Sequence, residues 1–588
     1  MAGRIKILAI AATLMAVVSC GKKGEPVIEL RYDENISLDY HEVIEAYSKL
    51  ADHYSRAELF EMGMTDVGKP LHLFMISGNR IFDPETIKRR GKSILLINNG
   101  IHSGEPVGID ASIEFAMEVL QDKEGVGRVL ENTVIAIIPL YNIGGSLNRS
   151  RFYRLNQDGP IYKGARRNAR NLDLNRDFVK KDSRNAFSFA EIFHYLDPDV
   201  FLDTHTTNGS DHQFTMTLIP TMHQKLPTGM DSFFREEMVA SLYERMNNET
   251  PWGMVPYVQT AGRRGIRSGI TAFNDHPYYS TGYTVLFNTF GFMTENLVHK
   301  PFPDRVRSTL DFMRFLAAYT NENSRKITEL RREGIEYTKT KKSFVLDWSL
   351  DRTSYDNILF KGYETEQVRS PITNRLTTHY HYDRKWSDTI PFYNYFTPRI
   401  EVEAPDAYII PHAWGDITER MIANGVEVHY LERDTVINVE SILVSNPQYS
   451  QRPTQGRFLI NNANFDKEFG ARQFYRGDAV IYVNQRSNNY IVHMLEPEAP
   501  ASFFRWGFFT SSLEGGEFFS IWGFESHAYD MLQDSEELRE LFERRMEQDE
   551  DFANDPVAQL QFIYDQVPQS DVITSSNIYP VARLISGR

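Results

Sequence analysis

From about residue 93 onward, the pattern of apolar and polar positions predicts strands that alternate with helices. Short apolar runs at Ser93–Asn99, Thr133–Leu140 and Asp199–Asp203 are typical of strands buried on both faces. Between the first two runs, apolar residues recur at helical spacing, at Ile109, Ile113, Ala116, Met117 and Leu120. The segments between the runs are long enough for crossover helices, so we expect an α/β domain with a mixed, largely parallel sheet flanked by helices.

Two further features extend this domain. Tyr283–Phe287 is another short apolar run, and it predicts an additional strand of the sheet. An amphipathic helix is expected where Val306, Leu310, Met313 and Leu316 repeat, and a second, charged helix over Asn323–Arg332.

After residue 339 the pattern changes. The chain becomes rich in Thr, Tyr, Val and Ile, with Pro and Gly between short segments, which predicts a strand-rich unit. A helix is expected at Ile417–Asn424, and Ser535 is placed to cap another helix that carries Leu538 and Leu541. The sequence therefore predicts an α/β domain over 40–335 and a strand-rich C-terminal domain of unknown role over 340–588.

Composition and charge narrow the function classes. The 588 residues suffice for two or three domains, and 41% of them are hydrophobic, which excludes a chain that is disordered throughout. The net charge of −15 gives no electrostatic footprint for nucleic acid, so we expect no nucleic-acid partner. The oligomeric state stays open.

The N-terminus carries a candidate export signal. Arg4 and Lys6 precede the apolar run Ile7–Val18, which is too short to span a membrane. Cys20, the one cysteine of the chain, follows directly, and this arrangement resembles the lipobox of bacterial lipoproteins. The resemblance implies a signal peptide over 1–19, lipidation at Cys20 and a tether over 20–39. The protein would then be an exported lipoprotein held to a membrane only by its lipid, facing the periplasm or the cell exterior. The alternative is an ordinary signal peptide with an incidental cysteine.

Candidate chemistry begins at Gly100–Glu105, directly after a predicted strand, where α/β proteins place their sites. Imidazole and carboxylate are suitable zinc ligands, and His102 and Glu105 would supply two of the three that a catalytic zinc site needs. A lone His-x-x-Glu is a weak signal, because a surface turn with a capping glutamate has the same pattern.

Three later segments carry polar residues of the same kind. In the first, Arg166–Phe178, cations and amides lie beside Asp173. The second, Asp199–His205, ends a predicted strand with a histidine, and in the third Glu295 follows an apolar run. Each has an ordinary reading, as a solvated basic loop or a buried polar group.

Together, in this order, the four segments resemble the zinc carboxypeptidases of the carboxypeptidase A type, over about residues 40 to 320. The resemblance implies that His102, Glu105 and His205 bind one Zn²⁺ per chain. It also implies that Glu295 is the general base and that the substrate is a peptide with a free C-terminal carboxylate.

The segment around Asp173 matches the family's Asp-x-Asn-Arg motif. The resemblance implies that Asp173 holds a zinc-bound histidine from behind, and that Asn175 and Arg176 bind the substrate's terminal carboxylate. It places Arg166 where related members keep an arginine that stabilises the oxyanion. Asp177 departs from the family, in which many members have Asn after the arginine.

The family's mobile tyrosine is not fixed by spacing, and the candidates are Tyr278, Tyr279 and Tyr283. Side-chain preference of the substrate is likewise left open. The sequence therefore predicts a metallocarboxypeptidase. An amidase or endopeptidase acting on cell-wall peptides or acylated amino acids would use the same zinc site. A third reading is an inactive peptide-binding protein built on the same fold.

Overall fold

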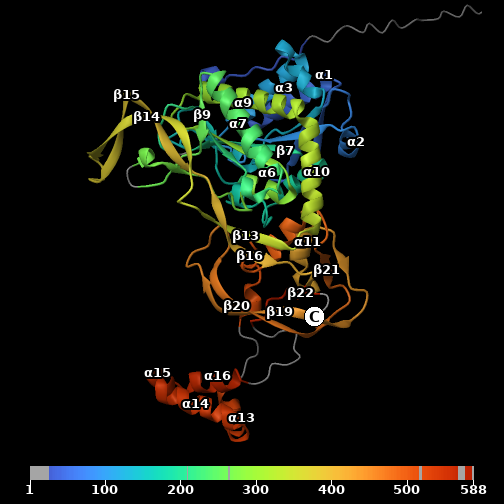
Figure 1. The fold of residues 1–588 in the computed structure, drawn as a ribbon, viewed down its shortest axis with the longest axis vertical. Coiled ribbons are helices and arrows are strands. Elements are labelled where there is room, and N and C mark those ends of the chain that lie inside the picture. The colour runs from blue at the N-terminus through green and yellow to red at the C-terminus, as the bar shows by residue number, and fades with distance from the viewer. Residues whose placement is uncertain (1–24, 208, 263–264, 515–519, 567–576, 586–588) are drawn as a thin grey trace, which may run out of the picture.

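The computed structural model describes residues 25–207, 209–262, 265–514, 520–566 and 577–585 (Figure 1). The expected signal peptide and Cys20 lie outside these residues. Within them, no helix is long and apolar enough to cross a membrane.

The first part of the chain is built on one eight-stranded sheet, in the order β1-β2-β4-β3-β7-β12-β8-β9. The four central strands β4, β3, β7 and β12 are mutually parallel, whereas β1 and β2 pair antiparallel with their neighbours. Strand β8 pairs antiparallel with β12 and parallel with β9. Their bounds are β1 Ala57–Met64, β2 Pro70–Ile76, β3 Ser93–Asn98, β4 Thr133–Ile138, β7 Val200–Thr207, β8 Met216–Pro220, β9 Met254–Pro256 and β12 Phe290–Leu297. The expected mixed, largely parallel sheet is confirmed.

Helices cover both faces of this sheet. One face packs against α1 (Tyr40–His53), α3 (Val107–Gln121) and α9 (Phe302–Glu322), and the other against α5 (Arg184–Leu196). Successive residues of a strand point to opposite faces, so Leu95 and Ile97 enter the first core while Ile94 and Leu96 enter the second. This burial on both sides explains the continuous apolar runs of the central strands.

The expectation of a strand at Tyr283–Phe287 is wrong. This run forms a short helix, α8 (Ser280–Thr284), followed by a 3₁₀ turn, η7 (Val285–Phe287), and the strand begins only at Phe290. A short, fully buried apolar run has no periodicity that separates strand from helix, and this run is buried throughout. The charged helix expected over Asn323–Arg332 is longer than predicted, because α10 spans Ser324–Thr340.

The C-terminal part is rich in strands, as expected. It contains the pair β13 (Ser343–Leu350) and β16 (Phe396–Glu403), and a six-stranded sheet in the order β18-β21-β17-β22-β19-β20. The bounds of the six are β17 Ala407–Ile410, β18 His429–Tyr430, β19 Thr435–Tyr449, β20 Ile460–Phe474, β21 Ala479–Tyr482 and β22 Ala582–Leu584. Two helices pack with them, α11 (Gly415–Ala423), near the predicted position, and α12 (Asn488–Leu495).

The two parts are interleaved rather than consecutive. A small sheet of the first part consists of β10 (Gln259–Thr260) and β11 (Ile270–Thr271). It is extended by a long hairpin of β14 (Asp356–Arg369) and β15 (Leu376–Tyr393), in which β15 pairs parallel with β11. The second apolar core also crosses the boundary, since Tyr283 and Phe287 lie in one cluster with Tyr408 and Tyr490.

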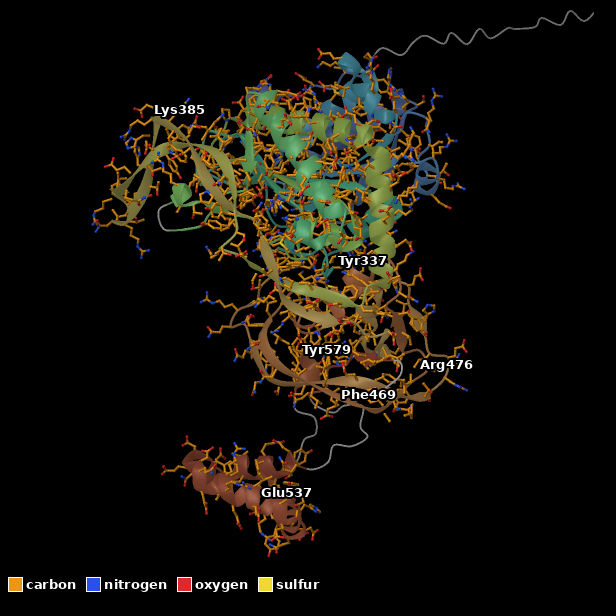
Figure 2. The ribbon with its side chains drawn as sticks, viewed as in Figure 1. Tyr337, Lys385, Phe469, Arg476, Glu537 and Tyr579 are labelled. Carbon is orange, nitrogen blue, oxygen red and sulfur yellow. The ribbon has the colours of Figure 1, made fainter. Side chains whose placement is uncertain are left out.

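Helices α13 (Ile521–Asp534), α14 (Glu536–Gln548), α15 (Glu550–Ala553) and α16 (Pro556–Tyr564) form a small bundle, drawn in red apart from the sheets in Figures 1 and 2. Its own core contains Ala528, Leu538 and Ile563. The Ser535 hydroxyl oxygen accepts a hydrogen bond from the backbone N–H of Leu538, which is the expected cap of α14.

Part of the segment expected to be a tether packs on the first domain. Tyr32 and Leu38 are buried, the Tyr32 hydroxyl donates to Glu114, and the Ser37 hydroxyl donates to Asp110 at 2.5 Å. Both acceptors belong to α3, so the chain is already bound to the domain before α1 begins.

Asp197 ties together elements that are distant in sequence. It ends α5 in the left-handed conformation (φ +47°), and its carboxylate pairs with Lys88, with Arg331 of α10 and with Arg486 of the C-terminal part. Burial would raise the pKa of Asp197, but the three cations hold it far below its ordinary value.

We expect Asp197→Asn to lower the stability at pH 7 by about 3 kcal/mol, because it leaves three cations around a neutral group. Asn tolerates the left-handed backbone, so the change tests charge rather than strain. The stabilisation that comes with a lowered folded-state pKa is complete above the ordinary value of about 4 and is lost progressively as the pH falls below it. The difference between the two proteins should therefore shrink below about pH 4. Urea unfolding against pH measures this, with exposed Asp52→Asn on α1 as the control. A constant difference at all pH values would contradict it.

Candidate active site

His102 and Glu105 lie in the turn between β3 and α3. Gly100 allows this turn, because its φ is +67° and a Cβ there would lie 3.1 Å from the Ile109 side chain. The Glu105 N–H donates to the His102 carbonyl at 2.8 Å, which brings the two side chains onto one side of the turn. Both residues are buried.

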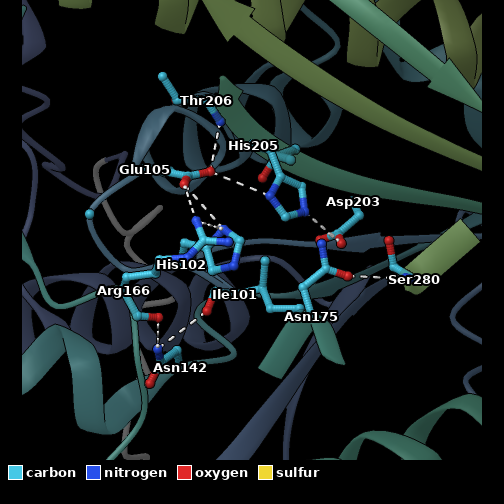
Figure 3. A network of polar contacts seen from close by, with 12 residues as sticks. Ile101, His102, Glu105, Asn142, Arg166, Asn175, Asp203, His205, Thr206 and Ser280 are labelled. Carbon is cyan, nitrogen blue, oxygen red and sulfur yellow. Dashed lines mark hydrogen bonds and ion pairs between the residues drawn. The ribbon is translucent and has the colours of Figure 1, made fainter. Parts of the chain in front are cut away.

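His205 enters the same site from the neighbouring parallel strand. It lies near the end of β7, which pairs with β3 on one side and with β12 on the other. The carboxyl ends of parallel strands meet at one sheet edge, so His205 comes to lie beside the turn that follows β3 (Figure 3). The ring centroids of His102 and His205 are 5.0 Å apart.

A carboxylate holds each histidine from behind. His102 Nε2 lies 3.0 Å from Asp173 Oδ1, and His205 Nε2 lies 2.8 Å from Asp203 Oδ2. An ionised carboxylate only accepts hydrogen bonds, so Nε2 carries a proton in both pairs. Both Nδ1 atoms therefore face inward, 3.1 and 3.3 Å from the Glu105 carboxylate. One ligand atom from each of His102, Glu105 and His205 lies within 4.8 Å of the others.

The Glu105 carboxylate is charge-balanced by its surroundings. Arg154 Nη1 donates to Oε1 at 2.7 Å, and the Thr206 N–H donates to Oε2 at 2.8 Å. Burial would raise the pKa of Glu105, but the charges of Arg154 and His102 hold it well below its usual range. Burial would likewise lower the pKa of His205, but the Asp203 carboxylate raises it well above its usual range.

Arg166 also reaches this centre. Its Nη1 lies 3.2 Å from His102 Nδ1 and 3.3 Å from Glu105 Oε1, while its Nη2 donates to Asp173 at 2.9 Å. The Asn142 side chain donates to the Ile101 carbonyl at 3.2 Å and to the Arg166 carbonyl at 3.1 Å (Figure 3). One amide thus fixes the turn of His102 and the loop of Arg166 relative to each other.

Glu295 lies on β12 directly opposite His205 in the parallel register. Its Oε2 is buried and has no hydrogen-bond partner among the described residues. Burial raises the pKa of Glu295 to about 7, with the charge of His205 opposing the shift. A buried carboxylate oxygen without a partner is costly, and beside a histidine cluster it is typical of a functional group.

Asn175 and Arg176 form a rigid unit near the histidines. They belong to a 3₁₀ turn, η3 (Leu174–Arg176), that Asp173 caps through the N–H of Asn175. Asn175 Oδ1 accepts from the Ser280 N–H at 3.2 Å, and Arg176 Nη1 donates to the Asn175 carbonyl at 2.7 Å. The Arg176 guanidinium lies over the Tyr279 ring, 4.3 Å from its centroid.

Of the three tyrosine candidates, two lie near Arg176. The Tyr279 ring stacks on the Arg176 guanidinium. Tyr278 and Arg176 line one cavity. Tyr283 lies in the second core, where its hydroxyl donates to Asn424 at 2.9 Å, so it is a packing residue.

Comparison with known proteins agrees with this geometry. Residues 43–212 match the model of the zinc carboxypeptidase family. Residues 43–212 therefore carry a zinc carboxypeptidase domain. This confirms the resemblance drawn from the four sequence segments, and with it the expectation of a peptide hydrolase. The matched region contains His102, Glu105, Asp173 and His205 and ends before Glu295.

Two similar curated proteins come from Trichophyton species. Carboxypeptidase 2 of Trichophyton tonsurans is 21% identical over 436 residues, which covers 70% of this chain and 73% of the relative. Carboxypeptidase 2 of Trichophyton rubrum is 19% identical over 455 residues, covering 74% and 77%.

Solved structures that resemble the chain include a metallo-carboxypeptidase from Burkholderia cenocepacia. It has a TM-score of 0.37 at 16% identity, and the match covers 50% of this chain and 71% of that one. A metallo-carboxypeptidase from Pseudomonas aeruginosa in complex with (2-guanidinoethylmercapto)succinic acid has the same four values.

The residues of the carboxypeptidase domain fit a zinc ion. Two imidazoles and one carboxylate are a donor set of catalytic zinc sites, and both histidines present Nδ1 while Nε2 is bound to a carboxylate.

Three contributors to the carboxypeptidase site were not found from the sequence. Asp203 was readable in principle, because residues two apart on a strand lie on one face and His205 is two residues later. Asn142 and Arg154 carry no motif, and only the folded chain brings them to Ile101 and Glu105.

We expect Asp203→Asn to weaken zinc binding by about 10- to 100-fold. The neutral amide would accept the hydrogen bond from His205 Nε2 more weakly than the carboxylate does, and it would hold the imidazole less firmly. Competition with a chromogenic chelator measures the affinity. Asp383→Asn, at an exposed position of β15, is the matched control and should bind zinc as the parent protein does. Equal affinities of all three proteins would show that Asp203 does not support the site.

Proposed function

We propose that the chain is a zinc-dependent metallocarboxypeptidase that hydrolyses the C-terminal peptide bond of peptides. The observation that carries this proposal is the unpaired, buried Oε2 of Glu295 beside the His102–Glu105–His205 cluster. A zinc ion held by these three residues would polarise the scissile carbonyl and acidify water.

Glu295 is the proposed general base. Its carboxylate would accept the proton of the attacking water and deliver it to the amine of the leaving residue. Burial fits this role, because a carboxylate with a raised pKa is a better proton acceptor than an exposed one. The absence of a protein partner on Oε2, among the described residues, leaves that oxygen available for water.

Arg166 is proposed to stabilise the oxyanion. Its side chain is 39% exposed, and its Nη1 lies at the inner face of the histidine cluster. A fixed cation at this position acts on charge that develops in the transition state. Arg154 has the more structural position, since its side chain is 10% exposed and donates to Glu105, Gln157 and the Thr206 carbonyl. We therefore assign Arg154 to positioning Glu105.

Asn175 and Arg176 are the proposed binding site for the terminal carboxylate. Arg176 makes no ion pair within 4.0 Å in the part of the chain that the structure describes, so its planar guanidinium is available for a bidentate carboxylate. It lies three residues beyond Asp173, which contacts His102, so the short reach between the two sites favours cleavage of the last peptide bond.

A substrate outside the cytoplasm follows from the proposed lipidation at Cys20, which would anchor the enzyme to a membrane by lipid alone. An amidase or endopeptidase using the same zinc residues is the competing function, and it would not need Arg176. The third reading, an inactive binding protein, is disfavoured because the zinc residues and Glu295 are all in place.

We expect Glu295→Gln to lower kcat by about 100- to 10,000-fold while zinc and substrate still bind, because the amide keeps the shape but cannot accept a proton. Single-turnover kinetics with zinc-loaded protein measure the loss, and calorimetry with a non-cleaved peptide measures binding. Exposed Glu124→Gln is the control. A near-normal kcat in Glu295→Gln would remove this residue as the base.

The choice between exopeptidase and endopeptidase is tested with one peptide in two forms. We expect C-terminal amidation to reduce kcat/KM by roughly 100-fold or more, because Arg176 then loses a charged partner in a partly desolvated site. Mass spectrometry of the products shows which bond is cut. Equal values for acid and amide would overturn the carboxypeptidase proposal in favour of its competitor.

A further inference from the structure

A large cavity lies beyond Arg176, between the carboxypeptidase domain and the C-terminal part. It has a volume of about 500 Å³, and Arg176 and Tyr278 line it from the first side. The remaining wall belongs to the C-terminal part and includes Gln455, Glu498, Arg505 and Trp506. The proposed carboxylate site therefore opens into a space that is built largely by the second half of the chain.

This wall is fixed directly to the site. Gln455 Oε1 accepts the backbone N–H of Asp173 at 2.9 Å, and Asp173 is the residue behind His102. In the same loop, Arg457 forms an ion pair with Asp182 at 2.7 Å. The position of the C-terminal wall is thus set by contacts on either side of the turn that carries Arg176.

Two side chains of this wall have hydrogen-bond donors that are unused or weakly used within the described residues. Trp506 is 5% exposed, and its indole Nε1–H has no partner among the described residues. The Arg505 guanidinium makes one long hydrogen bond, to the Ile460 carbonyl at 3.4 Å, and has no carboxylate within 4.0 Å in the described chain. A buried donor such as the Trp506 indole N–H is costly unless a ligand or water pairs with it.

The charges of the lining leave a cationic excess. Arg399 also lines the cavity, but it is paired with the buried Asp347. Glu498 is the one acidic residue of the lining, and its charge acts on Arg505 without forming an ion pair. Arg176 and Arg505 are therefore two guanidinium groups, one from each half, that face one cavity without a bonded anion.

We propose that Arg505 and Trp506 bind a second carboxylate of the substrate, so that the enzyme prefers peptides whose C-terminal residue is Asp or Glu. Arg176 would take the terminal carboxylate, and the side-chain carboxylate would reach the C-terminal wall. This inference rests on the proposed carboxypeptidase function, and it gives the second half of the chain a role in substrate selection.

The test compares two peptides that differ only in a C-terminal Glu or Gln. We expect the parent enzyme to cleave the Glu peptide with the higher kcat/KM, and Arg505→Gln to reduce the Glu-to-Gln ratio by about 10- to 100-fold, the strength of a charge-assisted hydrogen bond. Arg452→Gln removes a cation from the same region without lining the cavity, and it should keep the parent ratio. A ratio of one in the parent enzyme, or an unchanged ratio in Arg505→Gln, would overturn the inference.

A binding measurement separates this inference from the proposed function. Calorimetry with zinc-free protein should show tighter binding of N-acetyl-glutamate than of N-acetyl-glutamine, and Arg505→Gln or Trp506→Phe should reduce the difference. If neither peptide is cleaved but this preference is present, the proposed activity fails while the dicarboxylate site stands. If both peptides are cleaved equally and no binding preference is found, the activity stands and the site is refuted.

Discussion

The pairing of buried charges at one edge of the sheet is the constraint on which the site depends. Strands β3, β7 and β12 end side by side, and they bring the buried His102, Glu105 and His205 together with the buried Oε2 of Glu295. Each of these groups would be costly alone. Asp173, Asp203 and Arg154 balance them, and in doing so they fix the direction of both imidazoles and of the carboxylate.

The same constraint reaches outward from the histidines. Asp173 contacts His102 through its side chain, caps the turn of Asn175 and Arg176, and donates its own N–H to Gln455. The histidine cluster, the proposed carboxylate site and the C-terminal wall are therefore connected through one residue. A displacement of the turn at Asp173 would alter all three, which explains why the turn is anchored on both sides.

The sequence predicted what depends on local pattern. Continuous apolar runs identified β3, β4 and β7, because strands buried on both faces have no polar side. The site residues were assigned through the family resemblance of four segments, since each segment alone also had an ordinary reading. Tyr283–Phe287 was misread because a short buried helix has no exposed face to give it a period. Arg154, Asn142 and Gln455 act through contacts between residues far apart in the chain, which no spacing rule encodes.

The parallel pairing of β15 with β11 limits how this chain can be truncated or its domains exchanged. The eight-stranded sheet is complete at β12, and β13 follows it in the chain. Strand β15 then pairs with β11, which lies more than a hundred residues earlier in the sequence. A cut near residue 340 would leave β11 with an open edge. It would also remove Tyr490 from the Phe287 ring and Asn424 from the Tyr283 hydroxyl. The smallest autonomous unit is therefore larger than residues 43–212, which match the family model. The second half of the chain is part of the folded scaffold, and any exchange of domains would have to keep these contacts.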